Sequence, residues 1–235
     1  MILFPAVDVL DNRAVRLLYG KRDEVTDYGT PLDMALRWQE SGAQYLHIVD
    51  LNGAFDDSLV NKKTLVELIK NVKIPVQIGG GIKTFDKIKF YLEEVGASRV
   101  IVGTACVTNP DMMDIACAKY GNKIASGIDA KDGFVAIKGW VEKSTLTPLE
   151  VVLDMKKRGV DTVIYTDISR DGALCGANIE STAKLSQDSG MNIIASGGMA
   201  SLDDIKAVKK NNIYGAILGR AIYTGAIDLK EALKI

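Results

Sequence analysis

Two aspartates stand at matching places in the sequence and carry the groups needed for acid–base chemistry. Asp8 follows the apolar run at 4–7 and Asp129 follows the run at 124–128, an offset of 121 residues (8 to 129). Two carboxyl groups at one mouth suit proton transfer, with one kept protonated and the other ionised by its surroundings. A single aspartate here would equally be read as the cap of a turn, but the matched pair favours catalysis.

Two glycine motifs also occur twice. The segment IGGGIKTFDKIK at 78–89 reappears as ASGGMASLDDIK at 195–206, an offset of 117 residues (80 to 197). IVGTA at 101–105 reappears as ILGRA at 217–221. Each copy runs from an apolar strand through glycine to a helix start, which suits phosphate because glycine lets backbone N–H groups approach an anion and the helix dipole favours it. The doubled motifs predict a substrate with a phosphate at each end.

Further polar residues follow the strand patterns, each with two readings. Asp50 and Asp167 also match and would either act in catalysis or orient neighbouring loops. Thr166 and Asp171 lie beside the expected mouth, where they would bond substrate hydroxyls or assist the acid. His47 falls within a strand, so a structural role is favoured for it.

Three charged or aromatic positions lie close to the glycines or in long loops. Arg220 would contact a phosphate or cap a loop, and phosphate is favoured. Trp140 would stack on a planar ring of the substrate or pack its loop onto the protein. Arg16, Lys21 and Arg22 would steer phosphate or be solvated charges.

The elements that must position these residues alternate between strand and helix. Strand patterns fall near 2–8, 45–50, 74–78, 99–103, 124–128, 162–167, 192–196 and 215–219, and helical patterns near 31–41, 61–71, 84–95, 109–120, 147–158, 178–188, 201–211 and 227–234. Eight βα units of about 29 residues each predict a single α/β domain over 1–235, a (β/α)8 TIM barrel with half-barrels at about 1–121 and 122–235. A doubly wound open sheet is the rival, but a half-by-half repeat closes more naturally as a barrel.

Cap residues and long connections refine this expectation. Thr84, Asn109, Thr147 and Ser201 are expected to cap helix starts. The longest irregular stretches, 10–30 and 130–146, follow the first and fifth strands and are candidate lids.

Bulk composition excludes several classes of function. The chain has 235 residues, a formal net charge of −1 and 47% hydrophobic residues, so nothing favours nucleic acid or an anionic membrane as partner. No apolar run reaches the roughly 20 residues of a membrane span, and the N-terminus does not read as a secretion signal. Three scattered cysteines indicate reduced thiols and a cytoplasmic protein, and a single histidine argues against a histidine-rich metal site.

The motifs in their order resemble the phosphoribosylformimino-aminoimidazole carboxamide ribotide isomerases of histidine biosynthesis. They are FPAVD at 4–8, RAVRL at 13–17, HIVDLNGA at 47–54, QIGGGI at 77–82, VGTA at 102–105, GID at 127–129, GW at 139–140, TDISRDG at 166–172 and SGGM at 196–199. The resemblance covers essentially the whole chain. A related cyclase, imidazole glycerol phosphate synthase, shares the half-barrel repeat, but its first strand typically reads CLDV where this chain has AVDV at 6–9.

The resemblance implies an Amadori rearrangement, from aminoaldose to aminoketose, that needs no cofactor and no metal. It implies Asp8 as base and Asp129 as acid, with Thr166 and Asp171 assisting and Asp171 as an alternative acid. The substrate-binding residues it implies are Gly80, Gly81, Gly103 and Thr104 at one phosphate, Gly172, Gly197, Gly198, Gly219 and Arg220 at the other, and Trp140 on the lid. The expected partner is a small bis-phosphorylated substrate, and a monomer is expected.

Two positions depart from the family pattern. Asn52 stands where the family usually has Asp, and Lys83 stands where Arg is common, which loses the bidentate fork. Two other activities remain open at this point. One is a bifunctional isomerase that also acts on phosphoribosyl anthranilate, and the other is a non-catalytic barrel that binds phosphometabolites.

Overall fold

Eight parallel strands close into a barrel. The computed structural model describes residues 1–18, 21–137 and 139–235, with their side chains except those of residues 18 and 21–24. Within these ranges each barrel strand pairs with the next, and β10 pairs with β7 so that the ring closes. The ring runs β1 (Ile2–Leu10), β4 (Leu46–Asp50), β5 (Val76–Gly79), β6 (Arg99–Val102), β7 (Ile124–Lys131), β10 (Thr162–Asp167), β11 (Asn192–Ser196) and β12 (Gly215–Leu218), and β12 returns to β1. The TIM barrel expected from the βα alternation is confirmed.

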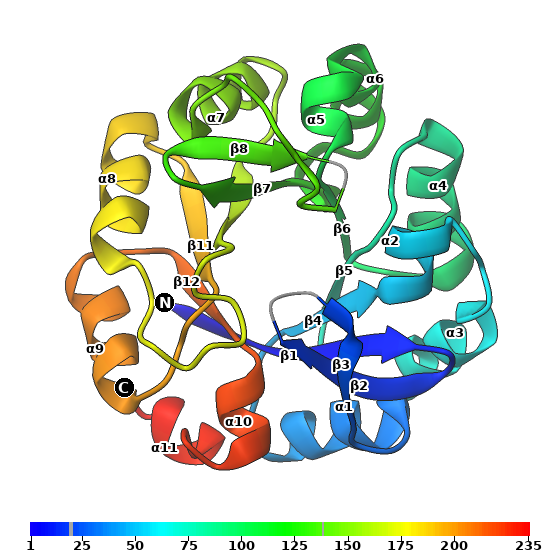
Figure 1. Ribbon diagram of the computed structural model, residues 1–235. Coiled ribbons are helices and arrows are strands. Elements are labelled where there is room, and N and C mark those ends of the chain that lie inside the picture. The colour runs from blue at the N-terminus through cyan, green and yellow to red at the C-terminus, as the bar shows by residue number, and fades with distance from the viewer. Residues whose placement is uncertain (19–20, 138) are drawn as a thin grey trace.

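Helices surround this ring (Figure 1). They are α1 (Pro31–Glu40), α2 (Leu51–Asp56), α3 (Lys62–Asn71), α4 (Phe85–Lys89), α5 (Ala105–Thr108), α6 (Pro110–Tyr120), α7 (Pro148–Lys157), α8 (Ile179–Ser189), α9 (Leu202–Lys210), α10 (Arg220–Thr224) and α11 (Leu229–Ala232), with a π-helical turn η1 (Phe90–Val95) and a 3₁₀ turn η2 (Gly121–Lys123). No helix in the described ranges combines the length and the apolar character that a membrane crossing requires.

Alternation along the strands divides the core in two. A small cluster in the barrel interior joins every second residue of several strands: Phe4, Ala6, Ile101, Ala125, Ile164, Ile194 and Ile217. The intervening residues, such as Val7 and Ile128, face outward and join the larger cluster under the helices. Asp8 continues the inward series of Phe4 and Ala6, and Asp129 continues that of Ala125, so both carboxylates face the barrel mouth.

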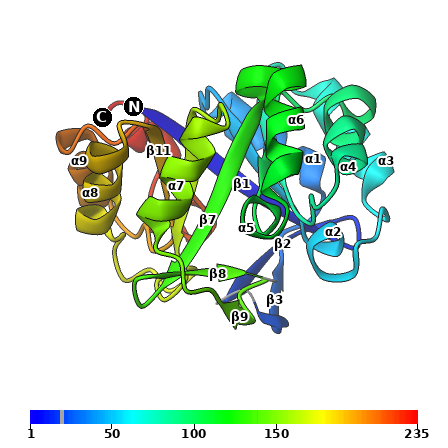
Figure 2. The ribbon, with the colours of Figure 1, turned by 90° about the horizontal axis from the view of Figure 1, so that it is seen from above.

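Two β-hairpins occupy the connections that the sequence predicted to be irregular. β2 (Arg13–Leu18) pairs antiparallel with β1 and with β3 (Lys21–Asp27), while β8 (Phe134–Ile137) pairs antiparallel with β7 and with β9 (Glu142–Lys143). The prediction of irregular structure was therefore wrong for most of 10–30 and for about half of 130–146. Figure 2 shows both hairpins at one end of the barrel, away from the two chain termini.

Most of the expected caps are present. Thr147 and Ser201 form capping boxes with Glu150 and Asp204, and Thr84 accepts a bond from the N–H of Lys87. Asn109 is the exception, because its side chain makes no cap bond. Its own N–H ends α5 by bonding the carbonyl of Ala105, and the helix it was expected to cap begins with a proline, which has no N–H at that position.

Candidate functional site

The two aspartates lie on opposite sides of the barrel mouth, because β1 and β7 are four strands apart in either direction around the ring. Each lies two residues before the end of its strand, not at the end as the sequence suggested. The reason is that both strands continue into their hairpins, where Asp8 lies opposite Val15 and Asp129 opposite Ala136. The matched placement expected from the repeat is thus retained two residues deeper in the strands.

Asp8 is paired with a cation from the first hairpin. The Nη1 atom of Arg16 lies 2.6 Å from Oδ2 of Asp8, and the two side chains are only 10% and 15% exposed. An ion pair this close and this protected is screened little by salt, and it compensates the negative charge of an ionised Asp8. Arg16 therefore belongs to the site, a role that the sequence did not distinguish from a solvated charge.

Arg16 lies in a slot shaped by its neighbours. Its guanidinium carbon lies 5.0 Å from the ring centroid of Tyr223, which α10 supplies, and its Nη2 donates to the carbonyl of Ala6 at 3.4 Å. A Cβ added to Gly219 would lie 2.7 Å from Nη2 of Arg16. The absence of a side chain at Gly219 thus makes room for Arg16, a steric reason for this glycine beside the expected phosphate contact.

Asp129 is held by neutral donors. Trp140 Nε1 donates to Oδ2 of Asp129 at 2.7 Å, so the second hairpin reaches the second carboxylate. Burial raises the pKa of Asp129, and hydrogen bonds from Trp140 and Thr166 offset that rise only in part. The surroundings of Asp129 thus favour its protonated form more than those of an exposed aspartate would.

A third carboxyl group, Asp171, joins the site from the loop after β10. Burial, followed by the negative charge of Asp8, raises the pKa of Asp171 to about 6, although Arg16 lowers it. Asp129 adds a smaller contribution in the same direction as Asp8. The structure therefore brings together Asp8, Asp129, Thr166 and Asp171, all four of the residues expected to act chemically.

The first glycine group lies after the neighbouring strands β5 and β6. Gly80 and Gly81 have φ of 118° and 64°, and an added Cβ would lie 2.2 Å from the carbonyl oxygen of Asp50 or 1.7 Å from that of Gly53. Close approach of the backbone after β4 therefore requires both glycines. Gly103 differs, because a Cβ there would touch only an oxygen at 3.9 Å. This leaves open space beside Gly103.

The second group lies on the opposite side, after β11 and β12. Added Cβ atoms at Gly197 and Gly198 would lie 2.7 Å and 2.4 Å from the carbonyl oxygens of Asp167 and Gly176. Arg220 Nη1 donates to the carbonyl of Gly172 at 2.8 Å, so this guanidinium also braces the loop after β10. This hydrogen bond fits the loop-capping role of Arg220. The phosphate contact that the sequence favoured stays a prediction.

Asp50 and Asp167 have structural partners in matched positions. Nδ2 of Asn61 donates to Asp50 and Nδ2 of Asn178 donates to Asp167, both at 2.8 Å. Asp50 also accepts the hydroxyl of Tyr91 at 2.7 Å. These bonds favour the loop-orienting reading for both aspartates.

His47 is buried inside the barrel, where its Nδ1 lies 3.1 Å from Nε2 of Gln77. Burial, with a smaller effect of Arg16, lowers the pKa of His47 to about 3, so its ring is neutral. The structural role expected for this histidine fits these contacts.

The remaining basic residues of the first hairpin, Lys21 and Arg22, lie outside the side chains that the structure describes. Among the described residues no group of three or more His, Cys, Asp or Glu side chains is arranged to hold a metal ion. The site thus combines three carboxyl groups, the guanidinium groups of Arg16 and Arg220, the hydroxyl of Thr166, the indole of Trp140 and two glycine-lined sides.

Comparison with known proteins places this arrangement in context. The family model described as histidine biosynthesis protein matches residues 2–228. A protein of Desulforamulus reducens is 47% identical over 100% of this chain and 97% of its own length, and one of Carboxydothermus hydrogenoformans is 47% identical over 100% and 98%. A protein of Clostridioides difficile is 42% identical over 100% and 98%. All three are named 1-(5-phosphoribosyl)-5-((5-phosphoribosylamino)methylideneamino) imidazole-4-carboxamide isomerase.

Proposed function

Because this chain belongs to the histidine biosynthesis protein family, we propose that it is an isomerase acting on the bis-phosphorylated imidazole carboxamide for which its relatives are named. The reaction is an Amadori rearrangement, in which an aminoaldose becomes an aminoketose. Three free cysteines, Cys106, Cys117 and Cys175, suit the cytoplasmic location that we propose with it.

One observation carries the proposal: at the barrel mouth, the line that joins the two glycine groups crosses the line that joins Asp8 and Asp129. The glycine groups after β5–β6 and after β11–β12 are four strands apart, and so are Asp8 and Asp129. A substrate with a phosphate on each glycine-lined side would therefore pass with its middle between the two carboxyl groups. That middle is where a phosphoribosyl substrate carries its reacting carbons.

Asp8 is proposed as the base. Arg16 pairs with it at 2.6 Å, and a carboxylate in such a pair can accept a proton. Arg16 also stays charged throughout the reaction, because a guanidinium does not deprotonate in proteins. Asp8, paired with Arg16, is thus suited to accept the proton from C2′ of the sugar, since an ionised carboxyl group need not first lose a proton.

Asp129 is proposed as the acid, with Asp171 as the alternative. Burial raises the pKa of both carboxyl groups, which favours a proton on each at higher pH than an exposed aspartate would keep. Thr166 bonds Asp129 and would orient it. Trp140, also bonded to Asp129, would move with the hairpin that covers the substrate.

The proposed steps move only protons and one ring bond. The acid protonates the ribose ring oxygen, the bond between C1′ and that oxygen breaks, and the ring opens to a Schiff base. Asp8 then removes the C2′ proton, which gives an enolamine, and tautomerisation of the enolamine gives the ketose. Every step needs a placed acid or base, and none changes an oxidation state outside the substrate.

Steady-state kinetics of the purified protein on two substrates tests the proposal. Turnover of the aminoimidazole carboxamide ribotide without turnover of phosphoribosyl anthranilate is expected. Comparable turnover of both would make the protein bifunctional. Binding of the ribotide without turnover would replace the enzyme by a phosphometabolite-binding barrel.

A further inference from the structure

The first hairpin turns through two residues with unusual backbone angles. Asp11 and Asn12 have φ of 49° and 63°, and they join Leu10 to Arg13, which pair across the hairpin. A two-residue turn with positive φ at both positions matches the twist of the strands, but it strains every residue other than glycine. Among the non-glycine residues, Asp and Asn tolerate positive φ best. Hydrogen bonds from outside the turn stabilise it further.

Four hydrogen bonds hold this turn to the barrel. The N–H of Asp11 donates to Oδ1 of Asn52, and Nδ2 of Asn52 donates back to Oδ1 of Asp11, both at 2.8 Å. The N–H of Asn12 donates to Oδ1 of Asn61 at 2.8 Å, and Oδ1 of Asn12 accepts the hydroxyl of Thr64 at 2.7 Å. Both strained residues are therefore held through main chain and side chain together.

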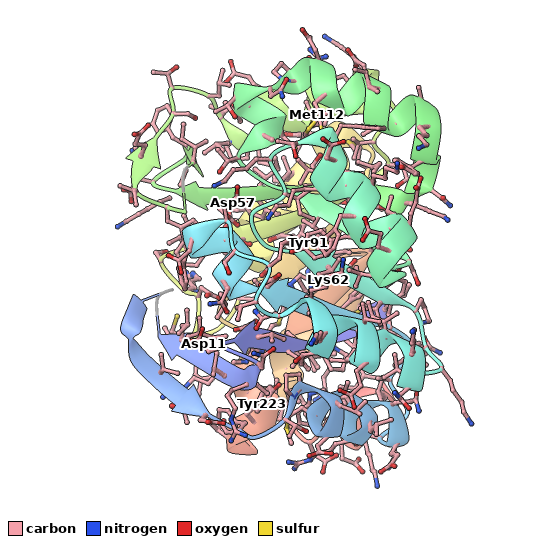
Figure 3. The ribbon with its side chains drawn as sticks, turned by 90° about the vertical axis from the view of Figure 1, so that its right-hand side faces the viewer. Asp11, Asp57, Lys62, Tyr91, Met112 and Tyr223 are labelled. Carbon is pink, nitrogen blue, oxygen red and sulfur yellow. The ribbon has the colours of Figure 1, made fainter. Side chains whose placement is uncertain are left out.

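The anchors of the turn are themselves fixed. Asn61 is fully buried, and its Nδ2 reaches Asp50, Oδ1 of Asn52 and the carbonyl of Val9 within 2.8–3.1 Å. Asp50 in turn accepts the hydroxyl of Tyr91. The network thus runs from Asp11 on the hairpin to Tyr91 on η1. Figure 3 labels these two end residues.

The turn determines where Arg16 lies. Register in a hairpin is set by its turn, and a slip of one residue moves every side chain to the other face. In the observed register Val15 lies opposite Asp8, and Arg16, the next residue, reaches Oδ2 of Asp8 through its long side chain, with Nη1 at 2.6 Å. A different register would change where the Arg16 backbone lies along β1, and with it this contact.

We propose that Asn52 is a positioning residue: its side-chain amide, bonded both ways to Asp11, fixes the hairpin register that places Arg16 against the base Asp8. This inference rests on the proposed isomerase activity. It also gives a physical reason for an amide at this position, since Asn52 must donate to one carboxylate while accepting from an N–H.

A carboxylate in place of this amide would oppose the turn. An oxygen would replace Nδ2 at 2.8 Å from the carboxylate of Asp11. The other charged or titratable groups near Asn52 are Asp50 on β4, Tyr91 on η1 and Asp57 after α2. Lys87 pairs with Asp57, and the positive charge of Lys83 also acts on Asp57. Two carboxyl groups this close share one proton at low pH and repel each other when both are ionised.

The experiment compares Asn52→Asp with Asp11→Asn and with the double variant carrying both changes. Asn52→Asp should lower kcat/KM about tenfold at pH 8, with the loss shrinking towards pH 5 as the pair binds a proton. Asp11→Asn should stay near the unaltered protein, because an amide oxygen still accepts from Asn52. The double variant should regain activity at pH 8, since Asn at 11 can donate to Asp at 52. Asp132→Asn, the same change in the turn of the second hairpin, is the matched control.

Each of the other outcomes contradicts either the positioning role of Asn52 or the proposed isomerase activity. Unaltered kinetics of Asn52→Asp at every pH, or a double variant as impaired as Asn52→Asp, would overturn the positioning role. If Asn52→Asp does not fold, the double variant decides in the same way. If the unaltered protein turns over no ribotide, the proposed function fails instead. The turn is then judged by thermal unfolding, where Asn52→Asp should lose stability as pH rises and the double variant should recover it.

Discussion

The two hairpins of the barrel mouth pair with their barrel strands in the same way, but they bring different side chains to the two aspartates. In each, an aspartate on a barrel strand lies opposite the third residue of the returning strand, Val15 for Asp8 and Ala136 for Asp129. The residue after Val15 is Arg16, whereas the residue after Ala136 is the apolar Ile137. The second hairpin supplies Trp140 to Asp129 instead, and an indole is a neutral donor.

This difference shows how a repeated scaffold can give two matched carboxyl groups different surroundings. A guanidinium lies 2.6 Å from Asp8, whereas burial raises the pKa of Asp129 more than the hydrogen bonds from Trp140 and Thr166 lower it. The strands need no asymmetry for this, because each hairpin brings a different side chain to its carboxyl group.

The two turns also differ. The first uses Asp11 and Asn12, which four hydrogen bonds brace, and the second uses Asp132 and Gly133 with φ of 52° and 82°. Glycine accepts positive φ without strain, so the second turn reaches the same geometry by its residue type. The hairpin that carries Arg16 is thus the one whose turn residues are bonded to the barrel by side chains.

Removal of the carboxylates is the strongest test of the two roles. Asp8→Asn and Asp129→Asn should each lower kcat by about 10² to 10⁴, because each removes a proton-transfer group. Binding of the ribotide, measured by calorimetry, should change little. Asp33→Asn on the exposed face of α1 is the control. A variant that turns over at the unaltered rate would show that the carboxyl group it lacks is not the proposed base or acid.

Asp171 should reveal the energetic cost of holding three carboxyl groups together. Its pKa is about 6 in the folded protein, against an ordinary value of 3.8 for an aspartate, so the fold disfavours its ionised form. The free energy of unfolding contributed by this group is therefore greatest below about pH 4, falls between about pH 4 and 6, and stays low above. Asp171→Asn should stabilise the protein by about 1–3 kcal/mol at pH 8.

Denaturant unfolding at pH 4 and pH 8 measures this effect. The gain in stability should be small by pH 4, where the unaltered carboxyl group is protonated in the folded protein and about two-fifths protonated in the unfolded chain. An equal stability of the two proteins at pH 8 would mean that Asp171 is well solvated or well paired, contrary to its burial beside Asp8. The variant should also turn over more slowly, since Asp171 is proposed to assist the acid.

The barrel was predictable because its signals are local. Strand and helix patterns alternate with glycine and cap residues between them, and each repeat copy restates the same order. Three short helices were missed: α2, α5 and α10 have six, four and five residues, too few to show a helical period by themselves. The β3 segment Lys21–Asp27 was missed because its letters, KRDEVTD, are nearly all polar and do not alternate.

The candidate carboxylates were predictable and their partners were not. Asp8 and Asp129 follow directly from the repeat, since matched offsets need no knowledge of packing. The pairing of Arg16 with Asp8 depends on the hairpin register, which could not be predicted from the residues of a polar turn. The steric reasons for Gly80 and Gly219 could not be predicted either. The carbonyl of Asp50 beside Gly80 and the guanidinium of Arg16 beside Gly219 come from distant segments of the sequence.

Trp140→Phe distinguishes the two candidate acids. The indole N–H lowers the pKa of Asp129, so its loss should raise that pKa further. If Asp129 is the acid, it stays protonated to higher pH, and the alkaline limb of kcat/KM should move up by less than about one unit. Loss of one hydrogen bond should lower kcat by less than about tenfold. An alkaline limb that stays in place in Trp140→Phe but disappears in Asp171→Asn would transfer the acid role to Asp171.

Gly133→Asn gives the second turn the residues of the first without its braces. The φ of 82° at Gly133 favours glycine, and an added Cβ would meet nothing within 4 Å, so the cost is conformational strain alone. Asn tolerates this region better than most residues, and the expected loss of stability is about 0.5–1 kcal/mol, read from thermal unfolding. Gly133→Ala should cost more, because alanine has no side chain that bonds the backbone in this region. Equal melting of Gly133→Asn and the unaltered protein would mean that an Asp-Asn turn is stable by itself, and the four bonds around Asp11 and Asn12 would then serve the register rather than the fold.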